Sequence, residues 1–275
     1  MALRILHLSD VHFGSEEPDL VAAVLASIPQ LAPDLIVVSG DITQRGRLRE
    51  FRRAREFLAA LGFPYLVIPG NHDIPAFNHF LLRVFTPFSR YRQWIRPSLE
   101  DCFHTKGAAV LGLNSARSFG PWFDWSRGGL TANSHQHARD FFAATDPADL
   151  RILTIHHPVI GRPNGPENRH LIEWRDVLLE TLHELRIDLV LGGHYHLAYH
   201  GLVKREQPEA HHFVVAQAST ACSHRRRGEA NGFNLVQIDA ERLHIAFHQW
   251  DGQNFAPWQE AEYARDQGLW HLLHG

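Results

Sequence analysis

Short apolar runs alternate along the first third of the chain with stretches whose apolar positions recur at helical spacing. The segments 19–32 and 48–61 have this helical spacing, and in the second Leu48, Phe51, Leu58 and Leu61 fall on one face. Three runs rich in leucine and β-branched residues are typical of strands: "LRILHLSD", "DLIVVSGD" and "PYLVIPGNHD". This alternation predicts an α/β fold.

The same pattern continues in the second half. The runs "AAVLGLN", "LRILTIHHP" and "IDLVLGGHYH" are predicted strands, and a helix is expected around 171–185. Three later runs lie close enough in sequence to form antiparallel strands: "HHFVVAQAS", "FNLVQID" and "RLHIAFHQW". Because there is no repeat, low-complexity segment or linker, we expect one domain over 1–275.

Composition narrows the class of protein. The chain has 275 residues and a formal net charge of −3, which gives no global footprint for nucleic acid or membrane surfaces. Its two cysteines, Cys102 and Cys222, are too few for a disulfide framework or a thiolate metal site. There is no signal-peptide pattern, and no run approaches the roughly 20 apolar residues of a membrane span. We therefore expect a soluble cytoplasmic protein.

Polar clusters follow five of the predicted strands. They are Asp10-Val11-His12, Gly40-Asp41, Gly70-Asn71-His72-Asp73, His156-His157-Pro158 and Gly193-His194-Tyr195-His196. In open α/β sheets the ligand crevice lies beyond the carboxyl ends of the strands, so one sheet is expected to gather all five. Glycines before Asp41, Asn71 and His194 leave room for a close approach. Each cluster alone is typical of a structural role, and only their shared position favours a common site.

Not every histidine pair has this context. The chain contains 21 histidines, so some His-x-His pairs arise by chance. No predicted strand precedes His135 and His137, and we interpret that pair as coincidental. His200 matches no cluster and is also expected to be a bystander.

The donor types in the five clusters indicate a metal site. They offer carboxylates, imidazoles and one carboxamide, a set that suits Mn, Fe, Co or Zn. Six or seven ligands exceed what one tetrahedral ion needs, whereas two ions sharing a carboxylate would use them all. Two such ions can clamp the attacking and leaving oxygens of a phosphoryl displacement.

The clusters together resemble those of the calcineurin-like metallophosphoesterases. The matching segments are "SDVH", "SGDITQRG", "PGNHD", "IHHP" and "GGHYH", which span residues 5–197. Within that superfamily the sequence is most similar to bacterial enzymes of the class III cyclic-nucleotide phosphodiesterase type. The resemblance implies a four-layer α/β/β/α sandwich, with two mixed β-sheets flanked by helices.

The resemblance also implies roles for the residues of the motifs. It places Asp10, His12 and His196 on a first metal ion and Asn71, His156 and His194 on a second, with Asp41 bridging both. The two ions per chain would be divalent or trivalent Mn, Fe, Zn or Co.

Two further residues of the "GNHD" motif take catalytic roles by the same resemblance. His72 would stand beside the substrate as a proton donor or phosphate-oxygen stabiliser, and Asp73 would orient it.

Three weaker signals concern the substrate. Arg45 has the offset of a phosphate-binding arginine in related protein phosphatases, or is a solvated arginine at the start of a basic helix. Arg226, within the run 225–227, would cap the site and steer an anion, or belong to an exposed basic loop. Trp122 and Trp125 would form a stacking lid, or pack against the domain.

These observations favour a dinuclear metal-dependent phosphodiesterase that cleaves a small, nucleotide-like phosphodiester, such as a cyclic nucleotide, by attack of a metal-bound hydroxide. The alternatives are a phosphomonoesterase or nucleotide pyrophosphohydrolase of the same superfamily and, in another class, a non-catalytic metal-binding scaffold. A scaffold should have lost ligands or His72, and this sequence retains them all. A nucleic-acid partner is disfavoured by the negative charge, and a homo-oligomer stays open.

Overall fold

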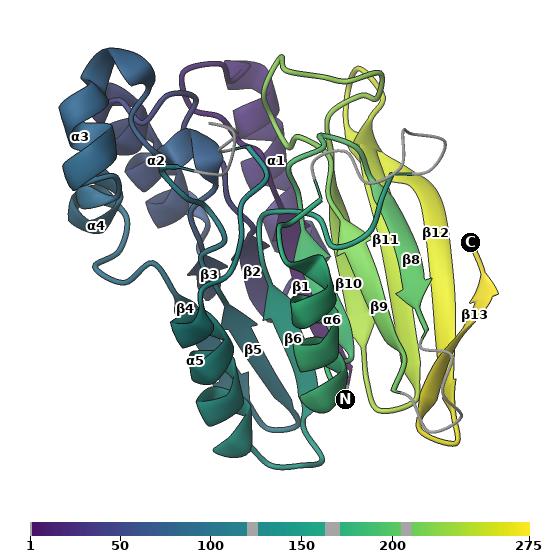
Figure 1. The fold of residues 1–275 in the computed structure, drawn as a ribbon. Helices are drawn as coiled ribbons and strands as arrows, with labels where there is room; N and C mark the ends of the chain where they lie inside the picture. The colour runs from purple at the N-terminus through teal and green to yellow at the C-terminus, as the bar shows by residue number, and fades with distance from the viewer. Residues whose placement is uncertain (1, 120–125, 163–170, 205–210) are drawn as a thin grey trace.

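The computed structural model describes residues 2–119, 126–162, 171–204 and 211–275. Two β-sheets lie face to face, and helices cover the outer face of each (Figure 1). The arrangement is the expected four-layer α/β/β/α sandwich of two mixed sheets. None of the described helices is long and apolar enough to cross a membrane.

The first sheet has seven strands in the order β13-β12-β11-β10-β1-β2-β3. β1, β2 and β3 run parallel, and the four strands from β10 to β13 add antiparallel pairs beside β1. The strands are β1 (Leu3–Leu8), β2 (Leu35–Val38), β3 (Tyr65–Val67), β10 (Gly232–Ile238), β11 (Arg242–Trp250), β12 (Phe255–Asp266) and β13 (Leu269–His274).

The second sheet has six strands in the order β4-β5-β6-β7-β9-β8. Its four central strands are parallel, and β4 and β8 are antiparallel edges. The strands are β4 (Asp101–Thr105), β5 (Ala108–Gly112), β6 (Leu150–Thr154), β7 (Leu189–Gly192), β8 (Tyr199–Val203) and β9 (Phe213–Gln217).

The helices divide between the two outer faces. α1, α2 and α4 pack on the first sheet, while α5 and α6 pack on the second (Figure 1). Their bounds are α1 (Pro18–Leu31), α2 (Leu48–Ala60), α3 (Phe80–Phe85), α4 (Ser89–Trp94), α5 (Ala132–Ala143) and α6 (Arg175–Glu184), with 3₁₀ turns at Asn71–Asp73 and Phe77–His79.

Three apolar layers hold these elements together. β1 shows how one strand serves two of them: Leu3 and Ile5 point into the core between the sheets, whereas Leu6 and Leu8 face α1 and α2. Because successive side chains of a strand point to opposite faces, a strand buried on both sides needs a continuous apolar run. The segment "LRILHL", which has apolar residues at positions of both faces, therefore also reflects the central place of this strand.

Two expectations about the sheets are corrected. The run "HHFVVAQAS" forms β9, which pairs in parallel with β7 in the second sheet, and only β10 and β11 form the expected antiparallel pair. The five ligand-bearing strands are also split: β1, β2 and β3 lie in the first sheet, and β6 and β7 in the second. A strand buried on both faces shows the same apolar run whichever sheet it joins, so periodicity could not assign it.

The C-terminal hairpin of β12 and β13 was not predicted, yet it closes the central core. The Trp270 ring is fully buried between the sheets, and its Nε1 donates a hydrogen bond to Asp188 Oδ1 at 3.2 Å. Asp188 Oδ2 also accepts from the backbone N–H of Arg151 at 2.9 Å. Trp270 thereby ties the edge of the first sheet to the start of β7 in the second.

Replacing Trp270 with alanine should lower the free energy of unfolding by about 3–5 kcal/mol, because a large buried ring is lost and a cavity remains. Trp270→Phe should cost less, since most ring contacts persist. On the same strand Leu272 is 47% exposed, and Leu272→Ala should change stability by no more than about 0.5 kcal/mol. Equal effects of Trp270→Ala and Leu272→Ala in urea unfolding would show that the hairpin does not close the core.

Candidate metal centre

The five polar clusters meet at one end of the sandwich, where the loops after β1, β2, β3, β6 and β7 are joined by backbone hydrogen bonds. The N–H of Asp10 donates to Gly40 O at 3.1 Å, and that of His12 to Asp41 O at 3.0 Å. Across the sheets, His194 N donates to Asp10 Oδ2 at 2.9 Å. The loops of both sheets therefore form one framework around the predicted ligands.

The backbone of this framework is strained where the ligands lie. Nine described non-glycine residues have positive φ, and five of them are predicted ligands. These are Asp10 (50°), His12 (51°), Asp41 (52°), His194 (76°) and His196 (56°). The left-handed region costs a residue with a side chain about 1–2 kcal/mol, and it persists only where the surroundings fix it. Strain of this kind concentrates at functional sites.

A close approach of two loops explains one of the glycines. A Cβ on Gly70 would lie 2.2 Å from Asp41 Oδ1 and 2.4 Å from Asp41 N. Any larger residue would therefore displace the Asp41 carboxylate. This agrees with the expectation that the glycine before Asn71 leaves room for a close approach.

One group of donors converges on a single point. The Nε2 atoms of His12 and His196 lie 3.0 Å apart, and His196 Nε2 lies 3.1 Å from Asp10 Oδ1. His196 Nδ1 contacts Arg225 O at 2.5 Å, and His12 Nδ1 contacts Thr43 O at 3.3 Å.

Those carbonyls can only accept, so both Nδ1 atoms carry a proton, and in the neutral rings both Nε2 atoms present lone pairs. Two facing lone pairs beside a carboxylate repel one another unless a cation lies between them. Asp10 Oδ1, which has no hydrogen-bond partner among the described residues, completes this arrangement. The donor set fits a metal ion.

A second group lies on the other side of Asp41. His156 Nε2 is 3.4 Å from Asp41 Oδ2, and His156 Nδ1 contacts Ser39 O at 2.9 Å. His194 Nδ1 lies 3.1 Å from Asn71 Oδ1. Asp41 Oδ2 is also 3.7 Å from His12 Nε2, so it lies between the two groups. The structure thus brings all seven predicted ligands together, with Asp41 common to both groups.

The protonation states of the buried groups suit metal binding. Burial alone would raise the pKa of Asp10, but His196 and His12 outweigh it and hold that pKa well below its usual value. Asp41 is lowered likewise, with His156 and His72 as the neighbours that outweigh burial. Burial lowers the pKa of His194 to about 3. Ionised carboxylates beside neutral imidazoles are the forms that ligate metals.

His156 differs from the other predicted imidazole ligands. Burial lowers its pKa, but the Asp41 carboxylate outweighs burial and raises the value to about 9. A cation binding between His156 and Asp41 must therefore displace this proton, so metal binding at neutral pH is expected to release it.

His72 stands beside the ligands, half-buried, with its ring 4.9 Å from that of His12. Its Nδ1 donates to Gln44 O at 2.7 Å, and its Nε2 lies 2.9 Å from Arg225 Nη1. The expectation that Asp73 orients this ring is corrected, because the Gln44 carbonyl, and not the Asp73 carboxylate, accepts the hydrogen bond from His72 Nδ1.

Asp73 instead fixes the loop backbones. Its carboxylate accepts from Thr43 N at 2.7 Å, Gly70 N at 2.9 Å and Ile42 N at 3.2 Å. Burial and the nearby Asp41 raise the pKa of Asp73 to about 7. The carboxyl group therefore holds the loop after β2 against the loop after β3, and so positions Asp41 and Asn71 together.

The weaker substrate candidates have different surroundings. Arg226 Nε donates to Asn231 Oδ1 at 2.7 Å, and its Nη2 pairs with Glu17. Arg45 is exposed, and its positive charge acts on Arg225. Trp122 and Trp125 lie outside the described residues. Arg225, the residue of the triple-arginine run that contacts His72, was not singled out, because three adjacent arginines give no sequence signal for which one turns inward.

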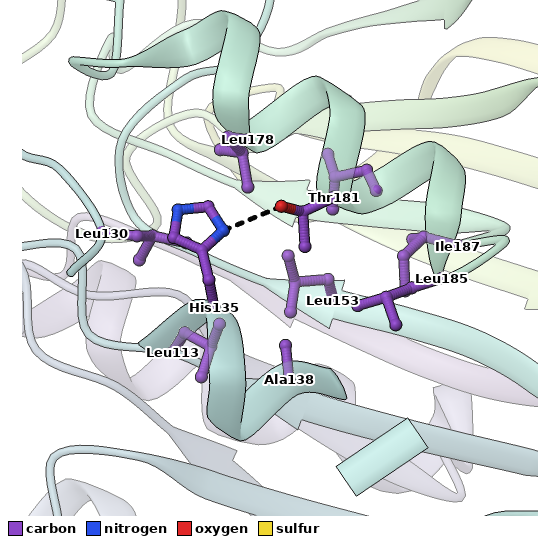
Figure 2. A pocket seen from close by; sticks show the side chains of 10 residues that line it. Leu113, Leu130, His135, Ala138, Leu153, Leu178, Thr181, Leu185 and Ile187 are labelled. Atoms are coloured by element: carbon purple, nitrogen blue, oxygen red, sulfur yellow. Dashed lines mark hydrogen bonds between the residues drawn. The ribbon is translucent and has the colours of Figure 1, made fainter. Parts of the chain in front are cut away.

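Two of the three histidines expected to be bystanders, His135 and His200, make their contacts away from the predicted ligands. His135 Nδ1 lies 2.9 Å from Thr181 Oγ1, between α5 and α6 (Figure 2). The small cavity beside this pair measures about 10 Å³ and is otherwise lined by aliphatic side chains, so it offers no phosphate site. His200 Nδ1 contacts the Tyr263 hydroxyl.

Comparison with known proteins gives a family and a fold. The family model "Calcineurin-like phosphoesterase" matches residues 3–198. The chain is 26% identical over 226 residues to a probable cyclic nucleotide phosphodiesterase of Synechococcus, covering 72% of this chain and 75% of the relative.

Two further known proteins are similar to this chain, one in part of its sequence and one in its fold. A glycerophosphodiester phosphodiesterase of Enterobacter lignolyticus is 40% identical over 111 residues, which cover 36% of this chain and 40% of the relative. The structure of a purple acid phosphatase from yellow lupin superimposes with a TM-score of 0.62 at 12% identity, covering 97% of this chain and 54% of that one. This last similarity concerns the fold alone.

The close approach at Gly70 leads to a test of the framework. Gly70→Ala should lower the Mn content of the purified protein, because the new methyl group displaces the Asp41 carboxylate. Gly161→Ala is the matched control, since a Cβ there meets no atom of the described residues within 4 Å and the change should leave metal content unaltered. Elemental analysis measures both, and circular dichroism checks folding. A folded Gly70→Ala protein with wild-type metal content would contradict the prediction.

Proposed function

Because the chain belongs to the calcineurin-like phosphoesterase family, we propose that it hydrolyses a small phosphodiester at a centre of two metal ions. One observation carries the proposal: the Asp41 carboxylate lies between two groups of imidazole and carboxylate or carboxamide donors. A single ion would leave one of these buried groups without a cation.

The residues divide into two ligand sets. Asp10, His12 and His196 would hold one ion, and Asn71, His156 and His194 the other, with Asp41 shared. Bound Mn, Fe, Zn or Co ions would polarise the phosphoryl oxygens and activate water as the nucleophile. Carbonyls of Ser39, Thr43 and Arg225 fix the tautomers of His156, His12 and His196, so that each ring turns its Nε2 toward the centre.

His72 would act on the leaving oxygen. Its Nδ1 is anchored on Gln44 O and its backbone N–H donates to Asp41 Oδ1 at 2.8 Å, so the ring has a fixed place beside the ligands. Nε2 is the ring atom that can exchange a proton with a substrate. In the imidazolium form Nδ1–H stays on Gln44 O and Nε2 carries the second proton, so we assign to His72 donation of that proton, or charge stabilisation by it, at the alkoxide that departs.

The substrate class follows from the named relatives. One is described as a probable cyclic nucleotide phosphodiesterase and another as a glycerophosphodiester phosphodiesterase, and both names denote a small phosphodiester. A cyclic nucleotide is therefore our preferred substrate. A phosphomonoesterase or a nucleotide pyrophosphohydrolase would have the same ligand set, so the substrate assay below includes both.

The metal-reconstituted protein should carry about two ions per chain and cleave bis-p-nitrophenyl phosphate faster than p-nitrophenyl phosphate. Asp41→Ala should remove both ions together, because the shared carboxylate contributes to both sets. His137→Ala, which changes an exposed imidazole outside the centre, is the control and should keep both ions. Elemental analysis and parallel assays on cyclic nucleotides and nucleotide diphosphate conjugates give the measurements. Loss of only one ion in Asp41→Ala would contradict the bridge, and hydrolysis of monoesters or pyrophosphates alone would favour the alternatives.

His72→Ala should separate metal binding from catalysis. Both ions should remain, because the seven ligands are unchanged, while kcat falls by about 10²–10⁴-fold through loss of acid assistance. The loss should be larger for a nucleoside alkoxide than for p-nitrophenolate, which departs without help. Measurements of kcat and metal content on both substrates test this. A mutant that lost metal, or that slowed both reactions equally, would defeat the general-acid assignment.

A further inference from the structure

The loop between β9 and β10 is bound to the predicted metal ligands. Thr220 Oγ1 donates to Asp10 O at 2.7 Å, and Asn231 Nδ2 donates to Ser223 O at 2.7 Å. In the same loop the Arg225 carbonyl accepts the His196 hydrogen bond at 2.5 Å. The backbone of Arg225 therefore has a fixed position relative to the centre.

The three adjacent arginines of this loop have different environments. Arg227 is exposed, and Arg226 is held by Asn231 and Glu17. Arg225 is half-buried, and its Nη1 lies 2.9 Å from His72 Nε2. Only Arg225 turns its side chain toward the catalytic histidine.

The guanidinium of Arg225 has donors to spare. It carries five N–H groups, and within the described chain its hydrogen bonds go to the His72 ring, while no carboxylate oxygen lies within 4.0 Å of it. A partly buried cation is costly without an anionic partner. Burial lowers the pKa of Arg225, whereas the negative charges of Asp41 and Asp10 raise it. Both carboxylates of the centre therefore act on this guanidinium.

We propose that Arg225 is a substrate-binding residue whose guanidinium holds a non-bridging phosphate oxygen opposite the metal ligands. Arg225 Nη1 then turns from His72 Nε2 to the phosphate, and the Nε2 atom becomes available to the leaving group. The planar fork of arginine matches two phosphate oxygens, which a lysine ammonium does not. The assignment to a diester reaction rests on the proposed function, whereas phosphate binding by Arg225 does not.

The competing role is that of a positioning residue, which would act only by holding His72. The two roles make different predictions. A phosphate-binding residue contributes to the affinity for inorganic phosphate, and its loss affects all leaving groups alike. A positioning residue leaves phosphate affinity unchanged, and its loss reproduces the leaving-group dependence of His72→Ala.

The test compares Arg225→Met, Arg225→Lys and the exposed control Arg227→Met in the metal-loaded full chain. The probe is inorganic phosphate, with its affinity measured by calorimetry and metal content by elemental analysis. Arg225→Met should weaken phosphate binding by about 10- to 100-fold, the loss of a charge-assisted pair, at unchanged metal content. Arg225→Lys should recover part of this, and Arg227→Met should bind as wild type. kcat/KM on bis-p-nitrophenyl phosphate and on a cyclic nucleotide should fall by similar factors in Arg225→Met.

Three outcomes would overturn the proposal: phosphate affinity unchanged in Arg225→Met, an equal loss in Arg227→Met, or metal loss that accounts for the effect. Failure of the proposed function is distinguishable. If wild type cleaves no phosphodiester but Arg225→Met alone weakens phosphate binding, the diesterase assignment falls and the role of Arg225 is supported.

Discussion

The Asp41 carboxylate is the point on which both halves of the sandwich depend. Its Oδ2 lies 3.7 Å from His12 Nε2 on the first sheet and 3.4 Å from His156 Nε2 on the second, while Oδ1 accepts the His72 N–H. Gly70 must lack a side chain for this carboxylate to fit, and Asp73 fixes the loop that carries it. The positions of ligands from both sheets are therefore set by how closely the loops approach one buried anion.

That arrangement is costly without a cation. Five predicted ligands adopt left-handed backbone, and the Nε2 atoms of His12 and His196 lie 3.0 Å apart. The hydrogen bonds between loops hold this geometry in place, so the donors are oriented before any ion arrives. Metal binding to such a site favours the folded chain over the unfolded one, because the unfolded chain has no comparable cluster. Strain in the loops and the proposed affinity for metal thus share one cause, the close approach of these donors.

The sequence predicted which candidate ligand side chains lie together better than it predicted their surroundings. Asp10, Asp41 and His194 could be proposed as ligands because each has a side chain that can bind metal and each follows a predicted strand. The carbonyls of Gln44 and Arg225, which orient the rings of His72 and His196, could not be predicted. Every residue has the same carbonyl group, and only the fold determines which one lies beside a given ring. Likewise, the apolar run of β9 predicts a strand but gives no sign of which sheet it joins, and the mixed pattern of β12 hides its role in the core.

The predicted metal ligands and the proposed phosphate-binding arginine come from different parts of the chain. All seven predicted ligands and His72 lie within residues 3–198, the part that matches the family model, whereas Arg225 lies beyond it. The loop that carries Arg225 reaches the centre through Thr220 and its own carbonyl, and both contacts are with metal-binding segments. Its backbone thus supports the predicted ligands, while the Arg225 side chain faces His72. In this arrangement a change of side chain in the 219–231 loop can alter which phosphate compound is held without disturbing the ligands, because the supporting contacts of Arg225 come from the main chain.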